Sequence, residues 1–164
     1  MPEVSWGESY RISRLKGLSP LNKSFLFKLI HTILPSKERL HHLNQNVSPQ
    51  CMCDNGAEES YLHLFFQCEL NKDAGQAMLR CVSAYDRTIT EEKALRLELQ
   101  ADDPFLVAMV NILATGLELI WENRKLKKAT SFFLMRAELE AAISIRRRSR
   151  FRALKETTKI MENL

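Results

Sequence analysis

Apolar residues recur at helical spacing along most of the chain, and this pattern predicts an all-helical protein. Between Phe25 and Leu34 they fall three and four positions apart, and Pro35 ends the predicted helix. Further helical patterns cover residues 36–44, 58–67, 70–85 and 88–100. No alternating pattern of useful length for a strand occurs. We therefore expect an all-α protein, a small helical domain of about six or seven helices.

The most apolar stretch lies between Phe105 and Trp121, inside a helix expected to run to about Lys128. It spans only 17 residues and contains polar Asn111 and Glu118. A membrane-spanning helix needs about 20 consecutive, predominantly apolar residues. The stretch therefore predicts a buried core helix, with no membrane as a partner.

The last predicted helix begins with a cap at Thr130 or Ser131 and extends to about residue 162. One stripe of this helix is apolar and consists of Phe132, Met135, Leu139 and Ile143. Residues 1–19 are polar and rich in turn formers, which suggests an N-terminal extension or a linker. Residues 20–164 are expected to form a single helical domain.

Composition and charge limit what kind of protein this chain can be and which partner it can have. The chain is 45% hydrophobic, so it is not disordered on compositional grounds. Its net charge is +4, but residues 124–155 hold eleven Lys or Arg against two Glu. This imbalance favours a local anionic partner. The N-terminus lacks the apolar region of a secretory signal, so we expect a nuclear or cytoplasmic, non-secreted protein with reduced cysteines.

Three of the four cysteines and one histidine lie close together in a possible metal-binding pattern. Cys51, Cys53, His63 and Cys68 follow the spacing C-x-C-x9-H-x4-C. Three thiolates and one imidazole are a common ligand set for structural zinc, and thiolates disfavour calcium and magnesium. The alternative is a group of buried free cysteines. We expect zinc as the cofactor, bound in a CCHC knuckle at residues 50–68.

The spacing also makes two predictions about this site. His63 and Cys68 are five residues apart, about 500° around an α-helix, so the helix must tighten or end near Gln67. Four protein ligands leave no open position for water or substrate, which excludes a catalytic zinc. No Ser-His-Asp set or phosphate loop occurs either, so no catalytic residue is expected. Cys81, in an amphipathic pattern, is expected to be a core residue.

Several motifs in this region resemble those of a known family. They are LPSKERL at residues 34–40, the C-x-C pair, Glu58–Glu59, HLFFQC from His63, and Trp121 with Arg124 downstream. Together they resemble the zinc-binding C-terminal region of non-LTR (LINE-like) retrotransposon reverse transcriptases. The resemblance is close over about residues 18–68. Over the remainder of the chain only the general character of the sequence is similar.

The resemblance implies a non-catalytic module that binds RNA or DNA and helps to hold them during target-primed reverse transcription. A reverse-transcriptase core in cis is then a further partner. The polymerase motif, an aromatic residue before x-Asp-Asp, is missing from this chain. We therefore expect the tail of a larger protein or a detached remnant. The alternative is a helical protein-interaction or dimerisation module derived from a retroelement.

An arginine run supplies the candidate nucleic-acid-binding residues. On a helix, Arg148, Arg152 and Lys155 form one ridge that can follow a phosphate backbone. The full predicted set is Arg146, Arg147, Arg148, Arg150, Arg152, Lys155, Arg124, Lys127 and Lys128. A solvated helix face and a nuclear localisation signal remain alternatives for the run. Lys127 and Lys128 can also act by offsetting the dipole of the preceding helix.

Overall fold

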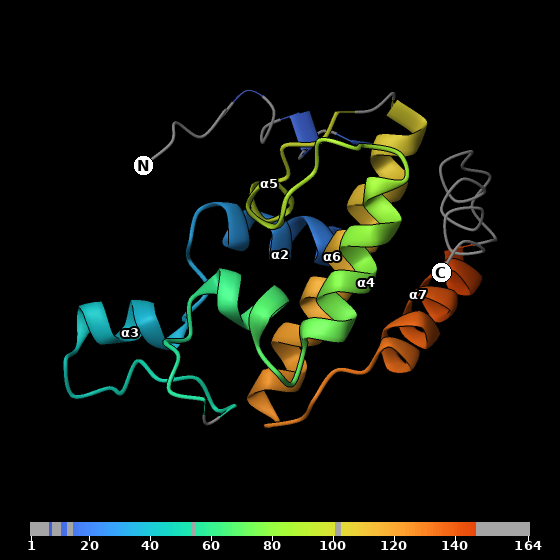
Figure 1. The fold of residues 1–164 in the computed structure, drawn as a ribbon. Helices are drawn as coiled ribbons and strands as arrows, with labels where there is room; N and C mark the ends of the chain where they lie inside the picture. The colour runs from blue at the N-terminus through green and yellow to red at the C-terminus, as the bar shows by residue number, and fades with distance from the viewer. Residues whose placement is uncertain (1–6, 8–10, 13–14, 54, 101–102, 147–164) are drawn as a thin grey trace.

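A computed structural model describes residues 7, 11–12, 15–53, 55–100 and 103–146 (Figure 1). The helical elements are α2 (Pro20–Ile30), α3 (Lys37–Leu43), η1 (His63–Gln67), α4 (Lys72–Ser83), α5 (Glu91–Arg96), α6 (Asp103–Lys125) and α7 (Phe132–Arg146). Within these ranges the only strand-like pairing is an isolated antiparallel bridge between Gln50 and Glu58. The expectation of an all-α protein is confirmed.

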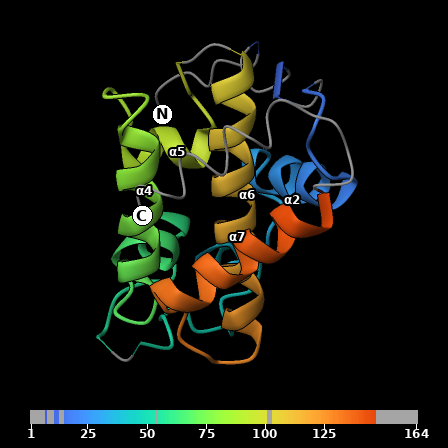
Figure 2. The ribbon, with the colours of Figure 1, turned by 90° about the vertical axis from the view of Figure 1, so that its right-hand side faces the viewer.

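The long helix α6 forms the centre of the structure. Helices α2, α4 and α7 pack against it, and α7 crosses it obliquely (Figures 1 and 2). Ile112, Leu113 and Leu117 of α6 are fully buried. By length and composition this helix could cross a membrane, yet 72% of its most apolar window is buried inside the protein. It is the core helix that the sequence predicts.

Side-chain caps fix where several helices begin, among them α3 and α7. The Ser36 hydroxyl accepts a hydrogen bond from the Arg39 N–H at the start of α3. At the start of α7 the Ser131 hydroxyl accepts from the Leu134 N–H, so Ser131 provides the cap. Each bond satisfies one of the N–H groups that a helix leaves unpaired in its first turn.

Helix α6 ends at Lys125 in a Schellman turn, slightly before the predicted end. The Lys128 N–H donates to the Asn123 carbonyl at 2.9 Å, and the Lys127 N–H donates to the Arg124 carbonyl at 3.0 Å. Lys127 has a φ of 52°, the left-handed conformation that this motif requires. Glycine adopts that conformation most readily, so a lysine there carries a backbone cost.

Part of the predicted N-terminal extension contributes to the core. Ile12, Leu15 and Leu18 are each less than a tenth exposed. They belong to the same buried cluster as Leu26 of α2 and Leu113 of α6. Residues before α2 therefore cover one side of the helical core.

The C-terminal basic helix, predicted at about residues 130–162, is described only as far as Arg146. Met135 of its apolar stripe is fully buried against the core. The side chains of the other stripe residues and of Arg146 are outside the described part. Also outside the described residues are Arg147, Arg148, Arg150, Arg152 and Lys155.

Candidate metal centre

The four predicted ligand residues meet at one point. The sulfur atoms of Cys51, Cys53 and Cys68 and a ring nitrogen of His63 all lie within 4.8 Å of one another. Cys51 Sγ and Cys68 Sγ are 3.7 Å apart, and Cys53 Sγ is 3.3 Å from His63 Nε2. Cys51, His63 and Cys68 are buried, and Cys53 is partly exposed. The fold thus brings together residues that are up to 17 positions apart in the sequence.

The two shortest of these separations, 3.3 and 3.7 Å, are close to those around a tetrahedral zinc ion. With Zn–S bonds of about 2.3 Å and a Zn–N bond of about 2.0 Å, neighbouring ligand atoms lie roughly 3.5–3.8 Å apart. The sulfurs of Cys51 and Cys68 are too distant for a disulfide, whose S–S bond is about 2.05 Å, and all four cysteines are free. The donor set and its spacing therefore suit zinc.

The first two ligands come from a short hairpin-like loop. The Cys51 N–H donates to the Ala57 carbonyl at 2.8 Å, beside the bridge that joins Gln50 to Glu58. Gly56 turns the chain with a φ of 78°, a conformation that favours glycine. The loop closes on itself, and this closure brings Cys51 near the other ligands.

The last two ligands come from a π-helical turn. His63 begins η1, Cys68 follows its end, and the Cys68 N–H donates to the His63 carbonyl at 2.6 Å. This is a bond between residues five apart, which defines a π-helix. The helix does end at Gln67, as predicted. The other predicted alternative, a tightening of the helix, does not occur, because the turn widens to hold one more residue than an α-helical turn.

Helix α4 holds η1 in place through an unusually close contact. A Cβ atom on Gly75 would lie 2.0 Å from the Phe65 carbonyl oxygen, so only glycine fits there. Phe65 and Phe66 are fully buried, and the Asn71 side-chain amide donates to the Leu64 carbonyl at 3.1 Å. The backbone between His63 and Cys68 is therefore fixed from outside the metal site.

Burial shapes the acidity of the three thiols in the absence of a metal. It raises the pKa of Cys51 and raises the pKa of Cys68 to about 12. Burial also acts to raise the pKa of Cys53, but hydrogen bonds from the Asn55 backbone and from the neighbouring cysteines outweigh it and lower that pKa. A bound divalent cation deprotonates its thiol ligands outright. The three thiols would then act as thiolates around the metal.

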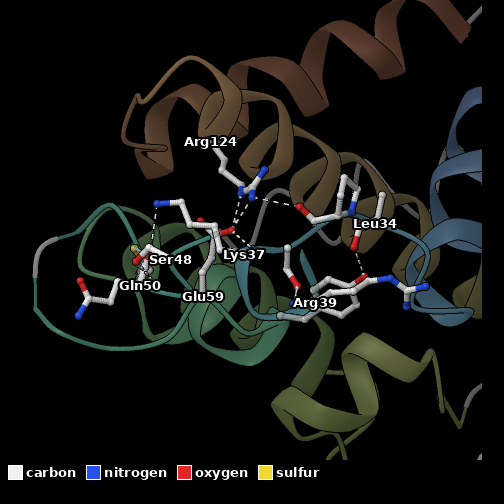
Figure 3. A network of polar contacts seen from close by, with 12 residues as sticks. Leu34, Lys37, Arg39, Ser48, Gln50, Glu59 and Arg124 are labelled. Carbon is white, nitrogen blue, oxygen red and sulfur yellow. Dashed lines mark hydrogen bonds and ion pairs between the residues drawn. The ribbon is translucent and has the colours of Figure 1, made fainter. Parts of the chain in front are cut away.

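A buried ion pair connects the knuckle to α6. Glu59 is fully buried, and its Oε1 accepts hydrogen bonds from Arg124 Nε at 2.8 Å and from Arg124 Nη2. Arg124 also donates to the Pro35 carbonyl at 3.2 Å, and its guanidinium lies 4.5 Å from the ring centre of Trp121. Figure 3 shows Arg124 reaching from α6 toward Glu59. The knuckle is thus anchored in the helical core.

Lys37 strengthens the same anchor from the start of α3. Its backbone N–H donates to Glu59 Oε1 at 2.9 Å, and its ammonium donates to the Gln50 carbonyl at 2.8 Å (Figure 3). The sequence alone predicts no role for Glu59 or Lys37 in this anchor. The only signal available was the acidic pair before the histidine and the downstream Trp-x-x-Arg pattern, which the structure brings together.

The structure places the remaining predicted residues as follows. Lys127 and Lys128 are exposed just after α6. Arg124 is mostly covered, with 13% of its side chain exposed, and already has an acidic partner. Its contact with nucleic acid therefore stays a prediction. Cys81 is buried in the core as expected, and burial raises its thiol pKa to about 11.

Comparison with known proteins supports the metal assignment. Residues 12–74 match the model of a protein family described as zinc-binding in reverse transcriptase. Neither the curated proteins nor the solved structures contain a match to the chain. Over residues 12–74, the match and the Cys3His cluster together support a zinc-binding segment similar to those of reverse transcriptases. The resemblance noted in the sequence is confirmed.

Proposed function

We propose that this protein is a non-catalytic nucleic-acid-binding module, like the tail of a retrotransposon reverse transcriptase. It would hold RNA or DNA through its basic residues during target-primed reverse transcription. The observation that carries the proposal is a closed Cys3His site within a segment that matches a reverse-transcriptase zinc-binding family. With four protein ligands, such a site supports a fold and leaves no position for a reacting water.

The charge distribution supports nucleic acid as the partner. The eleven Lys and Arg residues between positions 124 and 155 exceed the two Glu by nine charges. Contacts from such residues to phosphates position a nucleic acid without reading its sequence. A reverse-transcriptase core in cis is the second proposed partner, and the proposed location is the nucleus, the cytoplasm or both.

A salt titration tests this proposal. The zinc-loaded chain should bind labelled RNA and duplex DNA with an affinity that falls steeply as salt rises, because binding releases counterions. Replacing Arg148 and Arg152 with serine should lower the slope of log K against log salt by roughly 1.4–1.8. Affinity that is the same at low and high salt would contradict the proposal.

A second candidate is a protein-interaction or dimerisation module. Large apolar side chains are exposed near α7: Leu126 is 63% exposed, Phe133 79% and Leu134 40%. Exposed apolar patches often mark interaction sites. Dimers in light scattering, combined with no affinity for nucleic acid, would favour this candidate over the first.

A further inference from the structure

An open groove lies between the zinc knuckle and the end of α6. Its volume is about 600 Å³. One wall consists of the knuckle and the residues just before it, represented by Ser48, Gln50 and Met52. The other wall is the end of α6, with Lys125 and Lys127. The residues named for this groove, here called the knuckle groove, belong to the described part of the chain.

The knuckle groove is lined by cations. Lys37, Arg124, Lys125 and Lys127 all contribute to it, and none of the described lining residues is Asp or Glu. Glu59 offsets the charge of Arg124 from beneath the surface. Lys125 pairs with Glu122, but both side chains are about half exposed, and such pairs are worth little. The groove therefore keeps a positive charge that an anion can use.

The donors in the groove are held at defined places. The Lys37 ammonium uses one of its three donors on the Gln50 carbonyl, which also fixes the knuckle wall (Figure 3). On the opposite wall, the Schellman turn fixes the backbone that carries Lys125 and Lys127. Ser48 adds a hydroxyl to the knuckle wall. Cations and a hydroxyl on two facing walls are groups that contact phosphates in nucleic-acid complexes.

We propose that the knuckle groove binds the sugar–phosphate backbone of one nucleic-acid strand. This inference rests on the proposed function and names a second phosphate site, separate from the arginine run. Cys51, a metal ligand, lies in the knuckle wall itself. Phosphate binding in the groove therefore depends on zinc, whereas the arginine run contains none of the four ligand residues.

A plainer role for the cations of α6 is to offset the negative C-terminal end of its dipole. The two roles predict different results for Lys127→Gly. Glycine suits the left-handed backbone at this position, so the variant should fold at least as well as the parent. Weakened binding in a stably folded variant can then be assigned to the lost ammonium group.

The test uses the zinc-loaded full chain and a fluorescein-labelled single-stranded oligouridine, with fluorescence anisotropy measured over a range of salt concentrations. Lys125→Ser combined with Lys127→Gly should lower the slope of log K against log salt by about 1.4, and the affinity by roughly 25-fold at 0.1 M salt. The matched control, Lys28→Ser with Arg87→Ser, removes the same charge from outside the groove and should bind as the parent does.

Zinc removal provides the second comparison. Chelation of the zinc should lower the slope of log K against log salt for the parent by the same amount, about 1.4. It should not lower the slope any further for the groove variant, Lys125→Ser with Lys127→Gly. If the parent binds steeply with salt and the groove variant binds equally well, the groove inference is overturned while the proposed function stands. If the parent does not bind nucleic acid, the proposed function fails, and the groove inference fails with it.

Discussion

The four cysteines of this chain differ in role because they differ in their surroundings. Cys51, Cys53 and Cys68 converge with His63, whereas Cys81 lies among apolar side chains on α4. Cys81 is thus an internal control for the three ligands. A change at a ligand should affect the metal, and a change at Cys81 should affect only packing.

Replacing Cys68 with serine should abolish zinc binding at ordinary metal concentrations. Loss of a partner outside the ligand shell already costs roughly 10–100-fold in affinity, so loss of a ligand should cost more than about 100-fold. Native mass spectrometry should show one zinc in the parent and none in the variant. Cys81→Ala should keep its zinc and lose only about 1 kcal/mol of stability. Zinc retained in Cys68→Ser would show that the site is misassigned.

Zinc affinity should rise steeply with pH. Burial raises the pKa of Cys51 and Cys68, so both thiols are protonated between pH 6 and 8 when no metal is bound. Zinc must displace at least these two protons, so its affinity should increase by about 100-fold for each pH unit in this range. Competition with a coloured chelator at several pH values measures this. An affinity that stays constant would mean that the thiols are not ligands.

At the scale of elements, the π-helical turn η1 determines which residues face the metal. It holds an extra residue between His63 and Cys68, and the 2.6 Å hydrogen bond between their backbones closes the turn. Gly75 of α4 lies directly against the carbonyl of Phe65 in this turn. The directions in which His63 and Cys68 point therefore depend on the whole turn η1 and on helix α4, which packs against it.

Inserting one alanine after Gln67 should remove zinc although every ligand residue is kept. His63 and Cys68 would then be six positions apart, about 600° around an α-helix, so their side chains would face away from each other. Substituting Gln67 with alanine is the matched control, because its side chain is exposed and only the backbone length matters. The d–d absorption of bound cobalt can report tetrahedral coordination in both proteins. A tetrahedral spectrum in the insertion variant would contradict this account.

The sequence predicted the local features of this structure well. Caps such as Ser36 and the set of four ligands depend on residues close together in the chain, where spacing carries the information. The π-helical turn was missed because a 100° period contains no sign of an inserted residue. The Glu59–Arg124 pair was missed because its partners are 65 residues apart, and nothing in either local motif says that the two meet.

At the scale of the whole molecule, the Glu59–Arg124 pair makes the knuckle and the helical core one unit. Glu59 lies in the knuckle, Arg124 lies at the end of the central helix, and Lys37 joins them from α3. Three separate parts of the chain thus share one buried carboxylate. Loss of this contact should therefore lower the stability of the entire fold.

Replacing Glu59 with glutamine should lower the free energy of unfolding by roughly 3 kcal/mol. This is at the low end of the range for breaking a buried pair, because Arg124 keeps some contact with water. Urea denaturation followed by circular dichroism measures the change. Arg136→Ala, which breaks the exposed pair with Glu140, should cost less than about 1 kcal/mol. Equal effects of the two variants would rule out a special role for Glu59.

The buried position of Glu59 also determines where the chain can be cut. A fragment limited to residues 12–74 contains the whole family match, but it lacks Arg124, and it lacks most of α4 and all of α6. Glu59 would lose its counter-ion, and Phe65 and Phe66 would lose apolar neighbours on those helices. The matched segment is therefore not expected to be an autonomous folding unit. A protein that acquires this knuckle by recombination must acquire the downstream helices with it.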